Sequence, residues 1–253
     1  MTMHRVAPRL AATLDRFTAG RVLVAFDFDG VLAPIVANRE RAGIRADVRP
    51  LVASVAQRYP SVVISGRRLA DLAPRLEGLP LRGIYGNFGY EPPPRGAAPP
   101  PEVARWAAAL RTRLAAEHGV EVEDKGWSLA VHYRKAEHPV HARAAIQHLM
   151  HSLGGARMLD GTLAFTLLPG GSIHKGTALQ RARECANCDR AIYLGDDGTD
   201  EDAFASAPPS RLLAIRVGSR RPTRAHFTLA SQADVSTFLR ELLARRPAPH
   251  THR

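Results

Sequence analysis

The sequence is poor in cysteine, lysine and aromatic residues, and it contains no long apolar run. Its 253 residues include two cysteines, and aromatic residues make up 6% of the chain. Crossing a bilayer takes roughly 18 consecutive apolar residues, and no uninterrupted stretch approaches that length. Hydrophobic residues make up 45% of the chain, which is typical of soluble globular proteins. These features exclude a membrane bundle, a collagen-like chain and a disordered chain.

Charged residues interrupt the first 20 residues, at Arg5, Arg9, Asp15 and Arg16. This segment therefore lacks the apolar stretch of a signal peptide. We expect a cytoplasmic protein with no membrane partner, built as one large domain or as a core with a smaller companion.

The two cysteines form a Cys-Ala-Asn-Cys pair, Cys185 and Cys188, which is compatible with half a zinc site or a redox dithiol. No second Cys pair exists to complete a zinc site, so we interpret them as reduced thiols near the end of a helix. Four histidines fall on one predicted helix without an acidic or Cys partner, and we interpret them as a solvated face. They are His138, His141, His148 and His151.

Basic residues outnumber acidic ones by 35 to 24, which gives a formal net charge of +11. A nucleic-acid binder could carry such a charge. However, the arginines are spread along the whole chain, and few aromatic residues are available to stack on bases. The arginine excess is typical of a GC-rich genome, and we expect no nucleic-acid partner.

Short apolar runs alternate with predicted helices at both ends of the chain. Strands are expected near residues 21–28, 61–64, 81–85, 191–194 and 211–217, and helices near 47–59, 69–76 and 175–184. This alternation predicts an α/β fold with a doubly wound, Rossmann-like parallel sheet.

A proline-rich segment, residues 91–102, interrupts this pattern and is predicted to be a linker. Helices at 102–118 and 138–153 follow, each succeeded by two strands: 120–124 with 128–133, and 156–159 with 163–168. The second strand pair is expected to turn at Asp160-Gly161. We therefore predict an inserted α+β cap domain at residues 92–170, a discontinuous core at 1–91 and 171–245, and a disordered tail at 246–253.

Carboxylates follow the predicted parallel strands directly. Because ligands bind at the carboxyl ends of such strands, we expect these side chains to converge. Clustered carboxylates repel one another by several kcal/mol unless a cation bridges them, and oxygen ligands favour Mg²⁺. The predicted metal residues are Asp27, Asp29, Asp196, Asp197 and Asp200.

The same residues suit phosphoryl transfer. Asp27 can attack phosphorus as a nucleophile, and Asp29 can act as general acid and then as general base. Ser65 follows another strand and Lys175 begins a helix, so both can hold the phosphoryl group. Aspartates are also common turn formers and helix caps. Turn formation and helix capping do not account for four motifs in one chain, three of them at the ends of predicted buried strands. The motifs are Asp-x-Asp-Gly, Ser-Gly, Lys-Gly and Gly-Asp-Asp-x-x-Asp.

Five segments of the sequence resemble motifs of known enzymes. The segments are Phe26-Asp27-Phe28-Asp29-Gly30, Val63-Ile64-Ser65-Gly66-Arg67, Glu123-Asp124-Lys125-Gly126, Val131-His132-Tyr133-Arg134 and Gly195-Asp196-Asp197-Gly198-Thr199-Asp200. Over about residues 20–240 the chain resembles the haloacid dehalogenase-like (HAD) phosphatases, and more narrowly the trehalose-6-phosphate phosphatase family.

The resemblance implies a Mg²⁺-dependent phosphatase that converts trehalose 6-phosphate, a phosphorylated disaccharide, into trehalose and phosphate. We expect the protein to be a monomer. It implies an aspartyl-phosphate on Asp27, with metal ligation by Asp27, by the Asp29 carbonyl and by Asp196. Asp197 and Asp200 would support the metal. The substrate-binding residues would be Arg67, Asn87, Glu91, Glu123, Lys125, His132 and Arg134.

Two departures from the family pattern bear on the substrate. Phe88 stands where the family has a His, and no carboxylate occurs in residues 161–183, where the family has a sugar-binding Glu and this chain has Thr166 or Leu167. Loss of a sugar acceptor typically costs about 1–3 kcal/mol. A related phosphorylated pseudo-disaccharide, such as validoxylamine A 7'-phosphate, is therefore an alternative substrate. Further alternatives are a phosphosugar mutase and a non-catalytic nucleic-acid-binding protein on the same fold, which the intact acidic set opposes.

Overall fold

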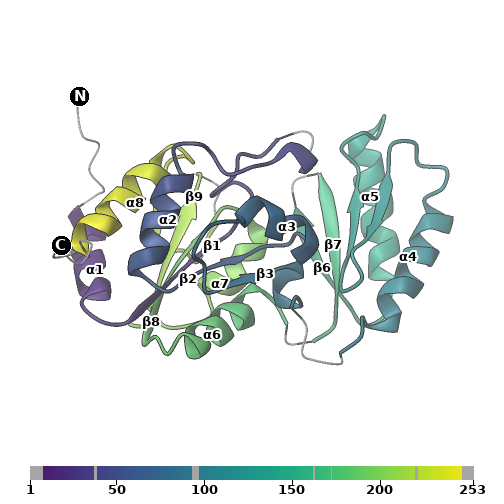
Figure 1. Cartoon of the computed structure of the whole chain (residues 1–253). Coiled ribbons are helices and arrows are strands. Elements are labelled where there is room, and N and C mark those ends of the chain that lie inside the picture. Colours follow the sequence, from purple (N-terminus) through teal and green to yellow (C-terminus); the bar gives the residue numbers. More distant parts are fainter. Residues whose placement is uncertain are drawn as a thin grey trace. The chain divides into compact units, whose positions relative to one another are not determined.

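The computed structural model describes residues 8–36, 39–92, 97–161, 163–171, 173–219 and 222–246. Contacts within the chain divide it into two compact units. The core unit comprises Met1–Pro92 and Ile173–Arg253, and the cap unit comprises Pro93–Ser172. Figure 1 shows both units coloured along the sequence.

The core unit is built on a parallel sheet of six strands, in the order β10-β9-β8-β1-β2-β3. Strand β1 lies between β8 and β2, so the chain passes to opposite sides of β1 before and after the cap segment. This point of reversal is where open α/β sheets bind ligands. The strands are β1 (Val22–Phe26), β2 (Ser61–Ile64), β3 (Gly83–Tyr85), β8 (Arg190–Gly195), β9 (Leu212–Val217) and β10 (Phe227–Leu229).

Helices cover both faces of this sheet, which confirms the predicted doubly wound α/β core (Figure 1). Strand β1 is apolar throughout, and its alternate residues enter two separate cores. Val22, Val24 and Phe26 pack with α1 (Pro8–Thr18), α2 (Arg49–Arg58), α3 (Leu69–Leu76) and α8 (Asp234–Arg245). Leu23 and Ala25 pack with α6 (Lys175–Cys185) and α7 (Glu201–Phe204).

The cap unit is an antiparallel sheet of four strands in the order β4-β5-β7-β6. Its strands are β4 (Glu121–Asp124), β5 (Leu129–His132), β6 (Ala156–Gly161) and β7 (Ala164–Pro169). Helices α4 (Pro101–Arg113) and α5 (Pro139–His151) supply Trp106, Leu110 and Ile146 to a core shared with Val131 and Phe165. The opposite faces of β4 and β5 carry polar side chains such as Glu123 and His132.

Several predicted boundaries are wrong. Strand β6 continues through Gly161, which pairs with Ala164, so Asp160 and Gly161 belong to the strand and do not form the turn. Helix α4 ends at Arg113 because Leu114 leaves helical geometry and successive turns reverse the chain into β4.

The disordered tail was predicted to begin at residue 246, but Arg246 is ordered by hydrogen bonds. The Arg246 guanidinium donates hydrogen bonds to the carbonyls of Arg58 at 3.1 Å and Gly20 at 3.0 Å. Residues 247–253 lie outside the described residues, as do residues 93–96 of the proline-rich segment.

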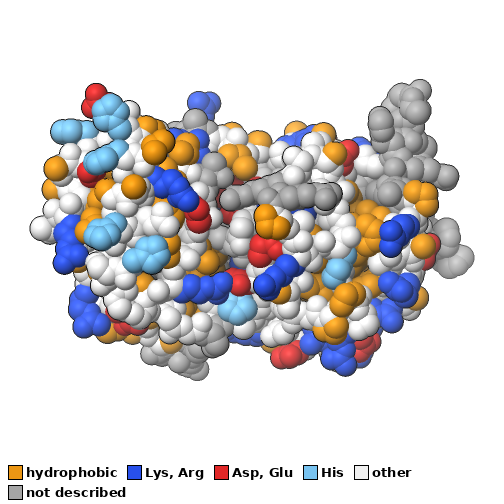
Figure 2. All heavy atoms as spheres, turned by 180° about the vertical axis from the view of Figure 1, so that it is seen from behind, with side chains coloured by type: hydrophobic (Ala, Val, Ile, Leu, Met, Phe, Trp, Pro, Cys, Tyr) orange, Lys and Arg blue, Asp and Glu red, His pale blue; other side chains and the backbone are white. Residues whose placement is uncertain are grey.

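Charged side chains of both signs are interspersed on the face shown in Figure 2, and histidines gather over the cap unit. His138, His141, His148 and His151 are all exposed, as expected of a solvated helix face. The expectation that they lack an acidic partner is wrong for His141, whose Nδ1 lies 3.6 Å from Glu117 Oε2. Cys185 is exposed at the end of α6 and Cys188 is buried, both as free thiols. Within the described ranges, no helix has the length and apolar character needed to cross a membrane.

Candidate active site

Asp27 stands at the end of β1, beside the loop that follows β8. Phe26 is in register with Leu194, and the Asp27 N–H donates to the Leu194 carbonyl at 2.8 Å. The carboxylate Oδ1 of Asp27 accepts from the N–H of Phe28 at 2.7 Å, which fixes its rotamer. Asp27 is buried, with 4% of its surface exposed. The sheet therefore holds this carboxylate rigidly where ligands bind.

Lys175 is the first residue of α6, immediately after His174, whose side chain caps the helix. Its ammonium Nζ lies 3.0 Å from Asp27 Oδ2 and 2.8 Å from Asp200 Oδ1. Burial opposes the charge, but the carboxylates of Asp200 and Asp27 outweigh it and raise the pKa of Lys175 well above its usual value. Lys175 is therefore a permanent cation in contact with Asp27.

Asp200 organises the loop after β8. Its Oδ1 accepts from Lys175 and, at 2.6 Å, from the Tyr193 hydroxyl. Its Oδ2 accepts from the N–H groups of Asp196 at 2.8 Å and Asp197 at 3.0 Å. Both oxygens are thus occupied by donors, and Asp200 supports the loop.

Asp197 also turns inward on the loop. Its Oδ1 accepts from the N–H of Thr199 at 2.8 Å and from the Thr199 hydroxyl at 2.6 Å. Burial alone would raise the pKa of Asp197, but Lys175 and the two hydrogen bonds from Thr199 lower it. Asp197 caps the short helix Gly198–Asp200 and holds the loop closed.

The carboxylates of Asp27, Asp196 and Asp200 have oxygens within 4.8 Å of one another. Burial, followed by repulsion from Asp200 and Asp197, raises the pKa of Asp196 to about 8. Burial likewise raises the pKa of Asp27 well above its usual value, although Lys175 acts in the opposite direction. An excess of buried carboxylate over cation is the electrostatic situation that a divalent ion relieves. The oxygen donors of this group fit Mg²⁺, with Asp27 and Asp196 available as ligands.

Asp29 is bound by Arg67. The guanidinium donates from Nε to Asp29 Oδ2 at 2.7 Å and from Nη2 to Oδ1 at 2.8 Å. Its Nη1 donates to Asp71 at 2.7 Å and to the Arg39 carbonyl at 2.9 Å. Burial acts against the charge of Arg67, but its bonds to Asp29 and Asp71 raise its pKa. The sequence analysis assigned Arg67 to substrate, whereas the structure engages its donors within the core unit.

Ser65 is buried, and its Oγ accepts from the N–H of Arg67 at 3.3 Å. The turn after β3 is bonded to this loop through two backbone contacts. The Asn87 N–H donates to the Arg67 carbonyl at 2.6 Å, and the Phe88 N–H donates to the Ser65 carbonyl at 2.9 Å. Glu91 Oε2 accepts from the N–H of Leu69, the first residue of α3, at 2.6 Å.

In the cap unit, three of the predicted substrate residues meet on one hairpin. Glu123 Oε2 lies 2.8 Å from His132 Nε2 and 4.0 Å from Lys125 Nζ. Strands β4 and β5 pair in antiparallel register, which puts Glu123 diagonally opposite His132. Arg134 lies exposed just beyond β5. These groups can donate and accept hydrogen bonds, as sugar hydroxyls require.

Comparison with known proteins identifies the family. The family model for trehalose-phosphatase matches residues 25–233, most of the chain. The chain belongs to the trehalose-phosphatase family.

Relatives in this family include the trehalose-phosphate phosphatase of Mycobacterium ulcerans (strain Agy99), 36% identical over 250 residues and 91% of this chain. The trehalose-phosphate phosphatase of Mycobacterium tuberculosis (strain ATCC 25618 / H37Rv) is 35% identical over 254 residues and 93% of this chain. The chain spans 64% and 65% of the length of these two relatives.

Solved structures share the fold. The C-terminal domain of trehalose-6-phosphate phosphatase from C. albicans superposes with a TM-score of 0.77 at 19% identity, covering 97% of this chain and 99% of that domain. A phosphatase of the haloalkanoate (HAD) enzyme superfamily from Bacteroides thetaiotaomicron has a TM-score of 0.64 at 16% identity, covering 88% of this chain and 94% of its own. The core unit therefore has the HAD fold.

At position 88, where the family resemblance predicts a His, this chain carries the apolar ring of Phe. Phe88 is buried and lies against Gly66, where an added Cβ would fall 2.6 Å from the ring Cζ. The ring thus packs on the loop of Ser65. Thr166 pairs with Ala130 and Leu159 in the middle of the cap sheet. A carboxylate is absent from that sheet position in this chain.

Sequence reasoning missed two residues of the site, Tyr193 and Arg216. Both stand inside largely apolar strands, and both are buried. The available signal in the sequence was a polar group within a run predicted to be buried. In Tyr193 this group is close in sequence to the acidic loop after β8, residues 196–200.

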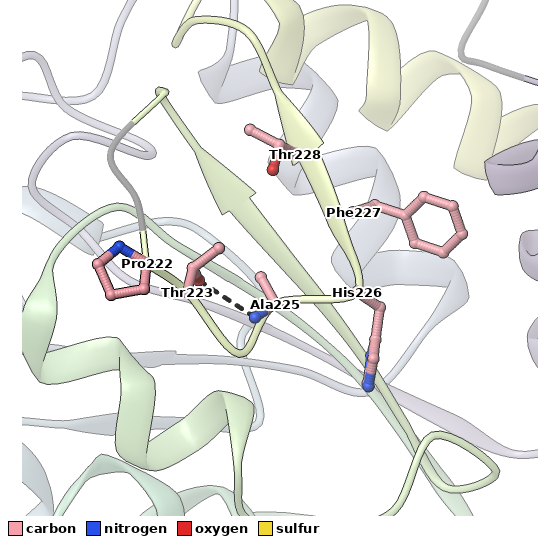
Figure 3. A pocket seen from close by; sticks show the side chains of 6 residues that line it. All are labelled: Pro222, Thr223, Ala225, His226, Phe227 and Thr228. Atoms are coloured by element: carbon pink, nitrogen blue, oxygen red, sulfur yellow. Dashed lines mark hydrogen bonds between the residues drawn. The ribbon is translucent and has the colours of Figure 1, made fainter.

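A separate hollow beside β10 is lined by Pro222, Thr223 and residues 225–228 (Figure 3). Thr223 Oγ1 accepts from the N–H of Ala225 at 3.1 Å, and His226 Nδ1 accepts from the N–H of Ala214 at 3.1 Å. None of the predicted site residues lines this hollow.

Proposed function

We propose that this protein is a Mg²⁺-dependent phosphatase that hydrolyses trehalose 6-phosphate to trehalose and phosphate. The observation that carries the proposal is the buried contact between Asp27 and Lys175 beside Asp196 and Asp200. A carboxylate held rigidly at a strand end, next to a permanent cation and further oxygen ligands, suits nucleophilic attack on a phosphate ester.

In the first step, an oxygen of Asp27 bonds to phosphorus, and the bond between phosphorus and the sugar oxygen breaks. Asp29, once its carboxyl group has turned away from the two donors of Arg67, acts as the general acid and gives a proton to the leaving sugar oxygen, which becomes a hydroxyl. Lys175 and the Ser65 loop stabilise the charge on the other phosphoryl oxygens. The product is an aspartyl-phosphate on Asp27.

In the second step, Asp29 takes a proton from water, and the water oxygen bonds to phosphorus as the bond to Asp27 breaks. Phosphate leaves, and Asp29 again holds the proton that the next turnover needs. Asp27, the Asp29 carbonyl and Asp196 would hold Mg²⁺, which when bound neutralises phosphoryl charge and the repulsion among carboxylates.

We assign recognition of the sugar to Glu123, Lys125, His132 and Arg134 of the cap unit, with Asn87 and Glu91 of the core unit. The contacts of Glu123 with Lys125 and His132 support the assignment, since together they offer both donors and an acceptor. Free thiols at Cys185 and Cys188 agree with a reducing compartment, and we place the reaction in the cytoplasm.

A second candidate substrate is a related phosphorylated pseudo-disaccharide, such as validoxylamine A 7'-phosphate. Phe88 and Thr166 favour it, because they supply neither the imidazole nor the carboxylate expected for trehalose 6-phosphate. Either substrate would undergo the same chemistry at Asp27.

The test is release of inorganic phosphate from a panel of phosphorylated mono- and disaccharides in the presence of Mg²⁺. We expect trehalose 6-phosphate to give the highest kcat/KM, and Asp27→Asn to retain less than about 1% of it, because the amide is not a nucleophile. A mutase would yield an isomeric sugar phosphate without net phosphate release. Higher kcat/KM on the pseudo-disaccharide phosphate would move the assignment to that substrate, and substantial activity of Asp27→Asn would remove Asp27 from its role.

A further inference from the structure

The backbone of Asp196 and Asp197, the first two residues of the acidic loop after β8 (residues 196–200), is held from both sides. The N–H groups of Asp196 and Asp197 both donate to Asp200 Oδ2. Their carbonyls both accept from the guanidinium of Arg216, through Nη2 for Asp196 and through Nη1, at 3.3 Å, for Asp197. The peptide plane between Asp196 and Asp197 is therefore held at both its carbonyl and its N–H, and the planes before and after it are each held at one group. These bonds fix the direction of the Asp196 side chain.

Arg216 is well placed for this contact. It lies on β9 in register with Gly195, the last residue of β8, and only 1% of its surface is exposed. Its Nη1 also donates to Glu201 Oε1 at 3.1 Å, and Glu201 Oε2 accepts from the N–H of Arg224 at 2.7 Å. The guanidinium is therefore held by its own partners and cannot swing away without breaking several bonds.

The shape of the guanidinium matters here. Two separate nitrogens reach two successive carbonyls, whereas an ammonium would present all its donors from one nitrogen. A neutral side chain of similar length would leave both carbonyls without these donors in a buried place. Arginine is therefore the residue that fits this position.

We propose that Arg216 is a positioning residue for the divalent cation, acting through the backbone of Asp196 and Asp197. It holds the Asp196 carboxylate facing Asp27, so that the two ligands are arranged before the ion binds. The inference rests on the proposed function for the identity of the ion, and it assigns a role to a residue outside the acidic motifs.

The test is calorimetric titration of the full chain with Mg²⁺ alone, without substrate. Arg216→Met should weaken Mg²⁺ binding by roughly 10- to 100-fold, as loss of a residue that orients metal ligands typically does. Arg216→Lys keeps the charge but cannot span both carbonyls, and it should weaken binding by at least about threefold.

Arg246→Met is the matched control, because Arg246 also donates to backbone carbonyls, at the end of α8. It should lower the free energy of unfolding by urea and leave the Mg²⁺ affinity unchanged. A purely structural role for Arg216 would give the same pattern as Arg246.

Equal Mg²⁺ affinity of the wild type and both Arg216 variants, within twofold, would overturn the inference while the proposed function stands. If Arg216→Met does not fold, Arg216→Lys decides by the same criterion. A wild-type protein that binds no Mg²⁺ would overturn the metal assignment in the proposed function, and the role of Arg216 with it.

Discussion

Gly30 illustrates how a single residue sets the spacing of the candidate site. Its φ of +74° lies in the left-handed region, and a Cβ there would fall 2.0 Å from Asp196 Oδ2. Because Gly30 has no side chain, its backbone adopts this φ without strain. The Asp196 carboxylate can also come close to the loop that follows β1.

Gly30→Ala should displace Asp196 and reduce both phosphatase activity and Mg²⁺ affinity by more than about tenfold. Gly78→Ala is the control, because Gly78 has a φ of +77° and nothing within 4 Å of an added Cβ. That variant should lose about 1–2 kcal/mol of stability through backbone strain alone and keep its activity. Steady-state kinetics and urea unfolding of both variants check this, and similar activity losses in the two would contradict the role given to Gly30.

The two cysteines should differ in reactivity. Cys185 is exposed, whereas Cys188 is buried and burial raises the pKa of its thiol. A raised pKa leaves less thiolate at a given pH, and the thiolate is the reactive form. Iodoacetamide at pH 8 should therefore alkylate Cys185 at least about tenfold faster than Cys188, as followed by peptide mass spectrometry. Comparable rates in the folded protein would show that the segment after α6 opens readily.

At the scale of elements, the loops after β2 and β3 form one unit. Backbone bonds join Asn87 to Arg67 and Phe88 to Ser65, and the Phe88 ring occupies the space over Gly66. Movement of one loop must therefore move the other, which couples Ser65, a proposed phosphate-binding residue, to the turn that ends in Glu91.

Gly66→Ala should disturb this unit, because the new Cβ would lie 2.6 Å from Phe88 Cζ. Overpacking of this kind typically costs about 1–3 kcal/mol. In the double variant with Phe88→Ala the clash disappears, so the two effects should be less than additive by more than about 0.5 kcal/mol. Urea unfolding of the four proteins gives the coupling, and strict additivity would mean that the loops do not share this contact.

The elements that were predictable are those with a simple pattern. Five of the six parallel strands were visible as short apolar runs, whereas the three-residue strand β10 was not predicted. The candidate site residues Asp27, Lys175, Asp196 and Asp200 were visible because they follow or begin such elements. Helices α1 and α8 were not predicted, because neither of them connects two strands of the sheet. They pack on one another, with Arg245 Nε 2.7 Å from Asp15 Oδ1.

The pairing of charges was not predictable. Arg67 and Asp29 are far apart in sequence, and nothing local to either residue indicates that they bond. Arg216 is one of many arginines in a chain where arginine is the usual cation, so only its place in a buried strand distinguishes it. Such partners depend on the register of neighbouring strands, which the sequence pattern does not specify.

At the scale of the whole molecule, the proposed function divides chemistry and recognition between the two units. Lys125→Ala should therefore lower kcat/KM for trehalose 6-phosphate by roughly 10- to 1000-fold, as expected when charge-assisted hydrogen bonds to the sugar are lost. Hydrolysis of para-nitrophenyl phosphate, which lacks the sugar, should change by less than about twofold.

Lys135→Ala is the control, since Lys135 is an exposed lysine of the same unit. It should affect neither substrate. Equal losses of Lys125→Ala on both substrates would show that Lys125 supports the fold or the chemistry and does not select the sugar.

The order of strands in the core sheet also governs how the protein is made. Strand β1 pairs with β8, and the entire cap unit lies between them in the sequence. During synthesis β1, β2 and β3 leave the ribosome first, with the β8 edge of β1 still open, and the acidic loop follows only after the cap. Pairing of such distant strands is slow because a long loop must close before any contact forms. In the cap unit the pairs β4–β5 and β6–β7 join neighbours in the sequence, and the one remaining pair, β5–β7, spans only α5 and β6. The nascent chain therefore carries Asp27, the proposed nucleophile, at the end of an unprotected apolar strand until β8 arrives, and this interval is when the chain is most exposed to aggregation.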